Sequence, residues 1–111
     1  MPRDYKVYLE DTLEAIGKIR RYTAGLSQEA FSGDEKTLDA VVRNLEIIGE
    51  AIKKVPGKIR SKHPEVEWKR IAGLRDILIH EYFGIDVDII WDIVQNKLPE
   101  LEKHVNLVLS Q

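Results

Sequence analysis

The longest periodic pattern in this sequence lies between residues 38 and 55 and ends at Pro56-Gly57. Within it, apolar residues recur at steps of three or four positions and therefore fall on one side of an α-helix. These residues are Leu38, Val41, Val42, Leu45, Ile48, Ile52 and Val55. Asp34 offers a cap for the helix, and Pro56-Gly57 stops it. A stripe this regular has to be buried, so the pattern predicts a core helix of a helical fold.

The segments before and after this helix are also predicted to be helical. Asp4 caps a first helix that ends near Gly25, and Ser27 begins one short helical turn. The basic stretch Lys58–His63 is expected to form a short helix or turn, which Pro64 closes.

The second half of the chain continues the helical pattern. A third long helix is expected from near Glu65 to Gly84, and Asp86 caps a fourth. Pro99 should kink or divide the remaining segment and leave a last amphipathic helix. No segment has the alternating pattern of a strand. We therefore predict one all-α domain over residues 1–111, an up-and-down antiparallel bundle of four to five helices.

Composition limits the classes of function. The chain has no cysteine and no apolar run long enough to span a membrane, so a cytoplasmic location is expected. A formal net charge of −2 argues against binding nucleic acid through an overall positive field. A local basic site stays open: Lys58–His63, with Lys69 and Arg70 nearby, is more often a solvated face, and RNA backbone contact is its functional alternative.

Arg75 and Tyr82 are polar residues inside an apolar stripe. At 100° per residue, Arg75 lies about 40° from Ile71 around the predicted third helix and Tyr82 about 20° from it. A buried guanidinium is tolerated only when paired, so Arg75 is either a structural ion-pair partner, with Glu46 and Glu50 as candidates, or a residue held ready for an anion.

His80 lies about 140° from Arg75 on the same predicted helix. Asp76, one turn earlier, is placed to orient the imidazole. Arg75 and His80 of one unbroken helix cannot converge on one atom, whereas two chains about a twofold axis can, which favours a homodimer. Taken alone, an Arg, a His and a Tyr on one helix are structural more often than catalytic.

Metal and cofactor chemistry has no motif in this sequence. The three histidines, His63, His80 and His104, fall in separate segments, and no Gly-rich phosphate loop or serine nucleophile motif is present. No cofactor is expected.

The segment Arg75–Tyr82 resembles the Arg, four residues, His, one residue, Tyr pattern of the HepT-like group of the HEPN superfamily. Val41–Ala51 is similar to the second-helix signature of that group, and the resemblance covers about residues 38–101. It implies a homodimeric, metal-independent endoribonuclease with Arg75 and His80 as catalytic residues. It further implies a toxin whose partner, a minimal nucleotidyltransferase antitoxin, adds AMP to Tyr82.

Two other interpretations use the same residues. One is a non-catalytic helical module that binds a nucleotide or a nucleotidyltransferase without cleaving RNA, and the other is a structural dimerisation domain. Asn44, Glu46 and Glu50 are candidates to support the site. An exposed row of salt bridges involving Arg43, Glu46 and Glu50 is an equal alternative.

Overall fold

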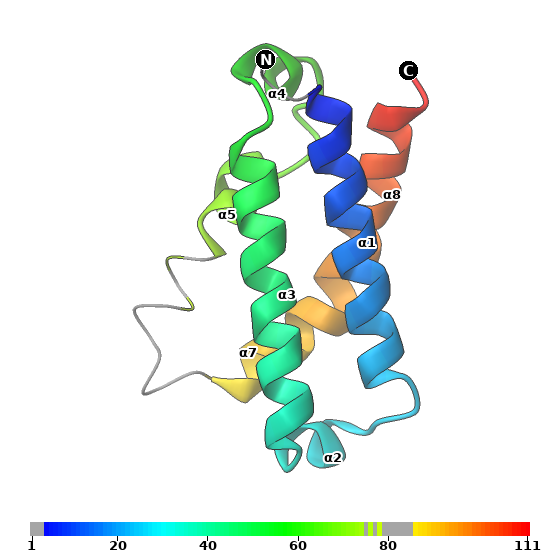
Figure 1. Ribbon diagram of the computed structural model, residues 1–111, viewed down its shortest axis with the longest axis vertical. Helices are drawn as coiled ribbons and strands as arrows, with labels where there is room; N and C mark the ends of the chain where they lie inside the picture. Colours follow the sequence, from blue (N-terminus) through cyan, green and yellow to red (C-terminus); the bar gives the residue numbers. More distant parts are fainter. Residues whose placement is uncertain (1–3, 75, 77, 79–85) are drawn as a thin grey trace.

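Two long antiparallel helices form the centre of the molecule. The computed structural model describes residues 4–74, 76, 78 and 86–111. Helix α1 (Tyr5–Thr23) runs beside α3 (Glu35–Lys53), and α8 (Leu98–Leu109) packs against α1 and runs parallel to α3 (Figure 1). The prediction of an all-α fold is confirmed for the part of the chain that the structure describes.

Shorter helices complete the bundle. Helix α2 (Gln28–Ser32) connects α1 to α3 at one end, and α4 (Gly57–Lys62) follows α3 at the other (Figure 1). The remaining elements are α5 (Trp68–Ala72), which packs on α3, then α7 (Val87–Asp92) and a π-helical segment, η2 (Ile93–Lys97). Among the described helices, none is long and apolar enough to cross a membrane.

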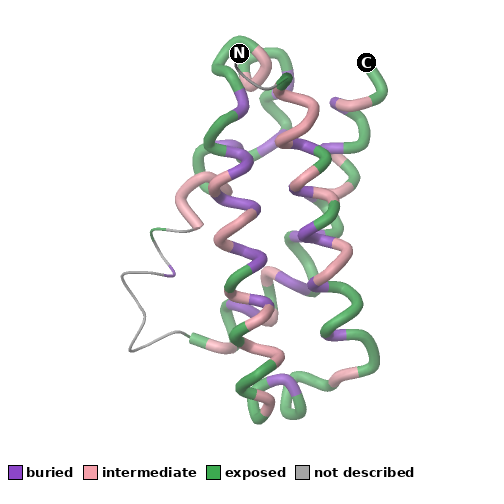
Figure 2. Tube along the Cα trace, viewed as in Figure 1, coloured by how far each residue is buried: buried purple, intermediate pink, exposed green. Residues whose placement is uncertain are grey.

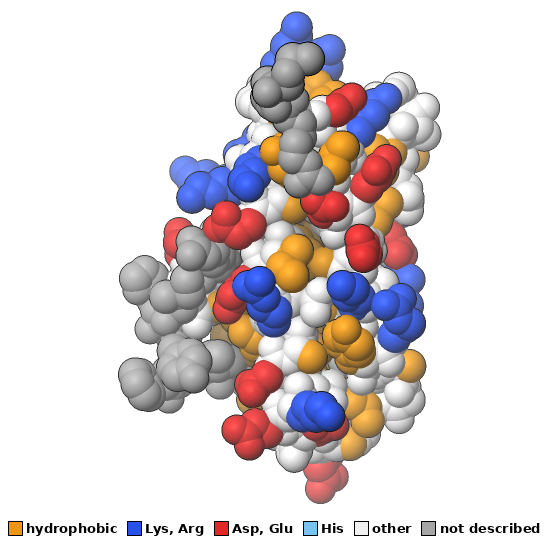
Figure 3. All heavy atoms as spheres, in the orientation of Figure 1, with side chains coloured by type: hydrophobic (Ala, Val, Ile, Leu, Met, Phe, Trp, Pro, Cys, Tyr) orange, Lys and Arg blue, Asp and Glu red, His pale blue; other side chains and the backbone are white. Residues whose placement is uncertain are grey.

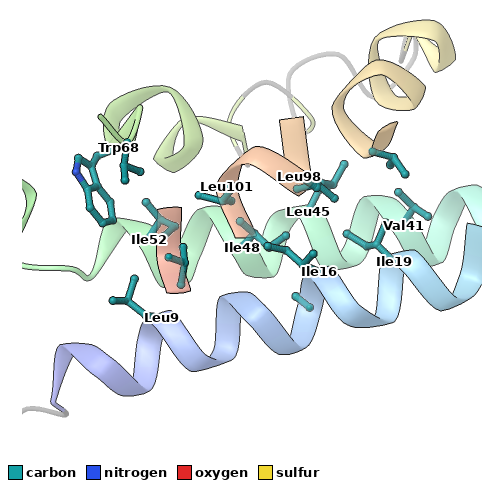
Figure 4. Packing of buried hydrophobic residues seen from close by; sticks show 14 of the residues in the cluster. Leu9, Ile16, Ile19, Val41, Leu45, Ile48, Ile52, Trp68, Leu98 and Leu101 are labelled. Atoms are coloured by element: carbon teal, nitrogen blue, oxygen red, sulfur yellow. The ribbon is translucent and has the colours of Figure 1, made fainter. Parts of the chain in front are cut away.

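The core lies where α1, α3 and α8 face one another. Buried positions follow the inner sides of α1 and α3 (Figure 2), and their side chains interdigitate with those of α8 (Figure 4). Leu9, Ile16 and Ile19 of α1 and Leu45, Ile48 and Ile52 of α3 are at most 1% exposed. Burial of a side chain of this size contributes about 1.5–3 kcal/mol, so the predicted stripe of residues 38–55 is a large part of the stabilising core.

Three helices begin at the predicted caps Asp4, Asp34 and Asp86, and the short helix predicted after Ser27 is capped by the Ser27 side chain. The side-chain oxygens of Asp4, Ser27, Asp34 and Asp86 accept backbone N–H bonds of 2.9–3.1 Å. Such bonds satisfy donors that the first helical turn leaves without a partner. After α1, the chain turns at Gly25, whose φ of +78° lies in the left-handed region that glycine adopts without strain.

The C-terminus of α3 is capped by a side chain from the next helix. The Arg60 guanidinium donates from Nε to the carbonyl of Val55 (3.0 Å). Its Nη2 donates to the carbonyls of Ile52 (2.9 Å) and Lys53 (2.8 Å). The Ile52 carbonyl also accepts the backbone N–H of Val55 (3.1 Å), whereas the guanidinium supplies a donor to the carbonyls of Lys53 and Val55 at and just beyond the end of the helix. Arg60 thus fixes α4 against the end of α3.

The prediction of one continuous third helix from Glu65 to Gly84 is wrong. Helix α5 ends at Ala72, and Gly73 forms a turn in which its N–H bonds the carbonyl of Lys69 (3.1 Å). Leu74, Asp76 and Leu78 beyond the turn are helical again. A glycine lowers helix propensity by about 1 kcal/mol, which favours a break at this position.

Pro99 divides the last helical stretch, as predicted. Before it, the N–H of Leu98 bonds the carbonyl of Ile93, a step of five residues that defines the π-helical segment. Proline has no N–H and its ring displaces the carbonyl four residues earlier, so the backbone widens by one residue ahead of it. Helix α8 then runs back along α1, where Glu102 pairs with Arg20 at 2.8 Å.

Candidate active site

Arg75, His80 and Tyr82, the three predicted motif residues, lie outside the described residues. Of the supporting residues, the structure describes Asp76 and, on α3, Asn44, Glu46 and Glu50. It also describes both flanks of the motif, α5 before it and α7 after it. These flanks determine where the two ends of the motif segment attach to the fold.

The preceding flank is anchored by Trp68, at the start of α5. Its side chain is 6% exposed, and the indole Nε1 donates to the carbonyl of His63 at 2.9 Å. A buried indole N–H needs such an acceptor, so the bond fixes the ring and holds α5 to the turn before it. Trp68 is therefore a core residue whose ring is not exposed for stacking on a base.

The following flank is anchored on α2. The Phe31 ring is fully buried and lies 5.1 Å from the ring of Trp91, between centroids. The Gln28 side-chain amide donates to the carboxylate of Asp88 at 2.6 Å. One aromatic contact and one hydrogen bond thus hold α7 against α2.

Asp76 lies on the exposed side of its helical stretch. Leu74 is half-buried and Leu78 is 6% exposed, and these two residues are one turn apart on the opposite side. The Asp76 carboxylate is therefore open to solvent, and its predicted role in orienting the His80 imidazole stays a prediction.

A hollow of about 330 Å³ connects the two flanks. Its walls are mainly the aliphatic side chains Val66, Ile71, Leu74, Leu78, Ile89, Ile90, Ile93, Leu98 and Leu101. Arg70 of α5, Lys97 of the π-helical segment and His104 of α8 also line the hollow, together with the carboxylates Glu65, Glu67, Asp86, Asp92 and Glu100. Ile89 is 55% exposed, so part of this apolar wall faces solvent.

Sequence reasoning missed Lys97 and His104 as neighbours of the motif flanks. The available signal is spacing, because Lys97, Leu101 and His104 are separated by four and three residues and share one helix face. Any helix shows this spacing, so the two residues could be recognised only once the structure placed α5, α7 and α8 around one hollow.

Asn44, Glu46 and Glu50 line a different hollow, a polar groove of about 420 Å³ between α1 and α3. Asn44 is 7% exposed and its Nδ2 donates to the carbonyl of Ala40 (2.9 Å). Glu46 forms an ion pair with Arg43 at 3.8 Å, which agrees with the alternative interpretation of these residues as an exposed row of salt bridges. Asn44 and Glu46 therefore have structural contacts on α3, and the support of the motif by Asn44, Glu46 and Glu50 stays a prediction.

Two groups in the described part of the chain have clearly shifted pKa values. The hydrogen bonds from the Thr37 hydroxyl and backbone N–H lower the pKa of Asp34 below its ordinary value. The Glu102 carboxylate raises the pKa of Arg20. Both groups are structural, at a helix cap and at the contact between α1 and α8. Among the described residues, no group of three or more His, Cys, Asp or Glu side chains is placed to hold a metal ion.

Comparison with known proteins identifies the family. Residues 12–108 match the family model described as ribonuclease HepT-like. A Thermococcus cleftensis protein named "Probable ribonuclease HepT" is 47% identical over 102 residues, which cover 92% of this chain and 93% of that protein. A Methanocaldococcus jannaschii protein named a "putative RNase" is 46% identical over 111 residues, 99% of this chain and 92% of that protein.

A third relative, a "putative RNase" from Caldanaerobacter subterraneus subsp. tengcongensis, is 47% identical over 104 residues, 94% of this chain and 93% of that protein. No solved structure matches the chain with significance. The chain belongs to the HepT-like family of ribonucleases. The family predicted from the resemblance at Arg75–Tyr82 and Val41–Ala51 is therefore confirmed.

Proposed function

We propose that this chain is a metal-independent endoribonuclease and the toxin of a toxin–antitoxin pair. Its antitoxin would be a minimal nucleotidyltransferase that silences it by adding AMP to Tyr82. The observation that carries the proposal is the family match over residues 12–108, which contains the whole of Arg75–Tyr82. The names of the relatives support RNA as the substrate.

His80 supplies the proton transfers in this proposal. Its imidazole accepts the proton of a ribose 2′-hydroxyl while the 2′ oxygen attacks the adjacent phosphorus. The bond from phosphorus to the 5′ oxygen breaks, and that oxygen receives a proton from the imidazolium. The products are a 2′,3′-cyclic phosphate and a 5′-hydroxyl end. Histidine suits both steps because its ordinary pKa lies near neutrality.

Arg75 stabilises the charge that develops on the phosphorus oxygens. A guanidinium presents parallel N–H donors that match two such oxygens, and it stays protonated at every pH at which a protein is folded. Placed where the negative charge grows, it lowers the barrier without any metal ion.

AMP on Tyr82 blocks this chemistry by bulk and charge. Tyr82 is two residues after His80 in the motif, so the nucleotide is attached close to the reacting groups. Its phosphate adds negative charge that repels the RNA backbone. One transfer from ATP, with release of pyrophosphate, is sufficient to silence a chain.

The proposed enzyme is a homodimer. Two chains about a twofold axis bring two motifs together, and each contributes residues to a shared cleft. Analytical ultracentrifugation at micromolar concentration should give twice the monomer mass of 12.8 kDa. A species that sediments only at 12.8 kDa contradicts the dimer.

RNA cleavage in EDTA tests the proposed activity. Purified wild-type protein should produce fragments with 2′,3′-cyclic phosphate ends, and His80→Ala should reduce the rate by 10²-fold or more, since general acid–base catalysis is typically worth about 10²–10⁴-fold. Equal melting temperatures of the two proteins establish that the variant folds. Equal inactivity of both proteins favours the module that binds a nucleotide or nucleotidyltransferase without cleavage.

Modification of Tyr82 is tested separately with a candidate nucleotidyltransferase and radiolabelled ATP. Wild-type protein should take up label and lose cleavage activity, whereas Tyr82→Phe should do neither. Tyr22→Phe is the matched control, because Tyr22 is an exposed tyrosine on α1, far in sequence from the motif. Label on Tyr82→Phe equal to that on wild type contradicts the assignment of the acceptor.

A further inference from the structure

Positive charge is concentrated in one part of this acidic chain. Between Lys53 and Arg70 there are seven Lys or Arg residues and two Glu residues, a net charge of +5. Because the whole chain carries −2, the residues outside this stretch carry −7. The proposed chemistry at Arg75 and His80 uses none of these seven cations, so their concentration needs a separate explanation.

These residues also lie together in space. The stretch comprises the C-terminus of α3, helix α4 and helix α5, and we call it the basic end. Lys and Arg side chains gather over α4 at the top of the molecule and at the upper left beside α5 (Figure 3).

Two sets of hydrogen bonds make the basic end a rigid surface. Arg60 joins α4 to the carbonyls at the end of α3, with three bonds of 2.8–3.0 Å. The indole of Trp68 joins α5 to the carbonyl of His63, with a bond of 2.9 Å. The exposed lysines therefore stand on a backbone that is fixed before any ligand arrives, which reduces the entropy that binding costs.

Most of the ammonium groups of the basic end have no carboxylate partner among the residues that the structure describes. Lys53, Lys58, Lys62 and Lys69 are exposed, and no described carboxylate lies within 4.0 Å of any of them. The other cations have partners: Arg70 pairs with Glu67 at 3.3 Å, and Lys54 lies 5.6 Å from the centre of the Tyr8 ring. Four cations thus remain available to an external anion.

We propose that the basic end binds the RNA phosphate backbone and presents the strand to the motif. Lys69 and Arg70 come five to six residues before Arg75, so the surface leads directly into the motif segment along the chain. Lysine ammonium groups act as point charges that attract phosphates without reading bases, which gives affinity and salt dependence rather than sequence specificity.

A nucleic acid fits this surface better than a membrane does. Proteins that lie on a bilayer add large apolar side chains that enter it. The exposed large apolar residues of the described chain, Tyr22, Ile89 and Leu107, all lie outside the stretch 53–70. The surface offers charge without an apolar anchor, as a polyphosphate chain requires.

The test compares two variants of equal charge. One carries Lys58→Ala, Lys62→Ala and Lys69→Ala in the basic end, and the control carries Lys6→Ala, Lys36→Ala and Lys103→Ala elsewhere. Binding of a fluorescent single-stranded RNA is measured by anisotropy in a His80→Ala background, so that it does not depend on cleavage. The kinetics of cleavage are measured separately with an active His80.

We expect the basic-end variant to bind RNA roughly 10- to 100-fold more weakly at about 0.1 M salt. The slope of log K against log salt concentration should become smaller in magnitude by about 2, because each of the three lost phosphate contacts contributes about 0.7. Its KM should rise with kcat unchanged, and the control should change affinity less than about threefold. Equal weakening in both variants assigns the effect to net charge and overturns the proposal, as does unchanged binding in the basic-end variant.

The proposal rests on the proposed ribonuclease function, and the two fail in different ways. If wild type cleaves RNA and the basic-end variant has the same affinity and KM, the ribonuclease function is supported and the RNA-binding role of the basic end is overturned. If RNA binding depends on the three lysines but wild type cleaves no RNA, the ribonuclease function is overturned and the RNA-binding role of the basic end is supported. If the three lysines are needed to bind vesicles of phosphatidylserine and phosphatidylcholine but not to bind RNA, the surface belongs to a membrane and the proposal is overturned.

Discussion

The basic end differs from the opposite end of the bundle in what its charges do. The opposite end consists of residues 28–39 and 86–92, which hold seven acidic residues and one lysine, a net charge of −6. There Asp34 and Asp86 accept backbone bonds at the starts of α3 and α7, and Asp88 accepts a bond from Gln28. At the basic end, by contrast, Arg60 caps a helix while four lysines have no described carboxylate partner.

This difference separates structural charge from charge available for binding. Carboxylates near helix N-termini stabilise the fold through the helix dipole and through hydrogen bonds. Lysines in the last turns of α3, α4 and α5 also interact favourably with the helix dipole, but they make no capping hydrogen bond and keep their ammonium groups in solvent. Variants at the acidic end should therefore change stability, whereas lysine variants at the basic end should change binding.

The largest effect is expected from Phe31→Ala at the acidic end. Phe31 is fully buried and contacts Trp91, so its removal leaves a cavity between α2 and α7. The free energy of unfolding should fall by about 3–5 kcal/mol, the usual range for a buried phenylalanine. Urea denaturation followed by circular dichroism measures the loss. Phe31→Leu is the control and should cost less than half as much, and a loss below about 1 kcal/mol for the alanine variant contradicts the packing described.

Arg60→Ala should have the next largest effect, because it breaks the scaffold of the basic end. The carbonyls of Lys53 and Val55 lose the donor that Arg60 supplies, and the carbonyl of Ile52 keeps only its backbone donors. The loss should cost about 2 kcal/mol, given the usual worth of bonds to a charged group. Arg60→Lys keeps the charge without the planar fork and should recover only part of the loss. Lys62→Ala, on the same helix, should leave the melting temperature unchanged within error. Full recovery by Arg60→Lys would assign the effect to charge rather than to capping.

Local signals were predictable from this sequence, and contacts between distant elements were not. The caps Asp4, Asp34 and Asp86 and the short helical turn after Ser27 were predicted and confirmed, because a cap depends on residues two or three positions away. The capping of α3 by Arg60 was missed, since it requires the turn at Pro56 to bring α4 back onto the helix end. The hollow between the motif flanks was missed because four elements form it.

The break at Gly73 was missed for a different reason. The apolar residues keep a helical spacing across Gly73, from Ile71 to Leu78. Spacing alone therefore does not distinguish a continuous helix from one interrupted by a single turn residue. The motif itself was predicted from its resemblance to a family. The family is confirmed, while the roles of Arg75, His80 and Tyr82 stay predictions that the cleavage and labelling experiments test.

A smaller effect is expected from Asp86→Ala at the start of α7. The variant removes the carboxylate that accepts the N–H of Asp88 at 2.9 Å, and the loss of such a cap typically costs about 1 kcal/mol. Asp86→Asn keeps an acceptor oxygen and should restore most of the stability without the charge. Thermal melts of the three proteins measure the order. If Asp86→Asn is as unstable as Asp86→Ala, the contribution is electrostatic rather than a hydrogen bond.

The smallest effect concerns the titration of Asp34. Hydrogen bonds from Thr37 lower the pKa of Asp34 in the folded state, so folding favours its ionised form. The stabilisation is fully present above the ordinary pKa of the unfolded chain, about 3.9, and is lost as the pH falls through the lower folded value. The melting temperature of wild type should therefore fall below about pH 4 more steeply than that of Asp34→Asn, whose cap does not titrate. Identical slopes for wild type and Asp34→Asn would mean that the acidic end gains nothing from this charge.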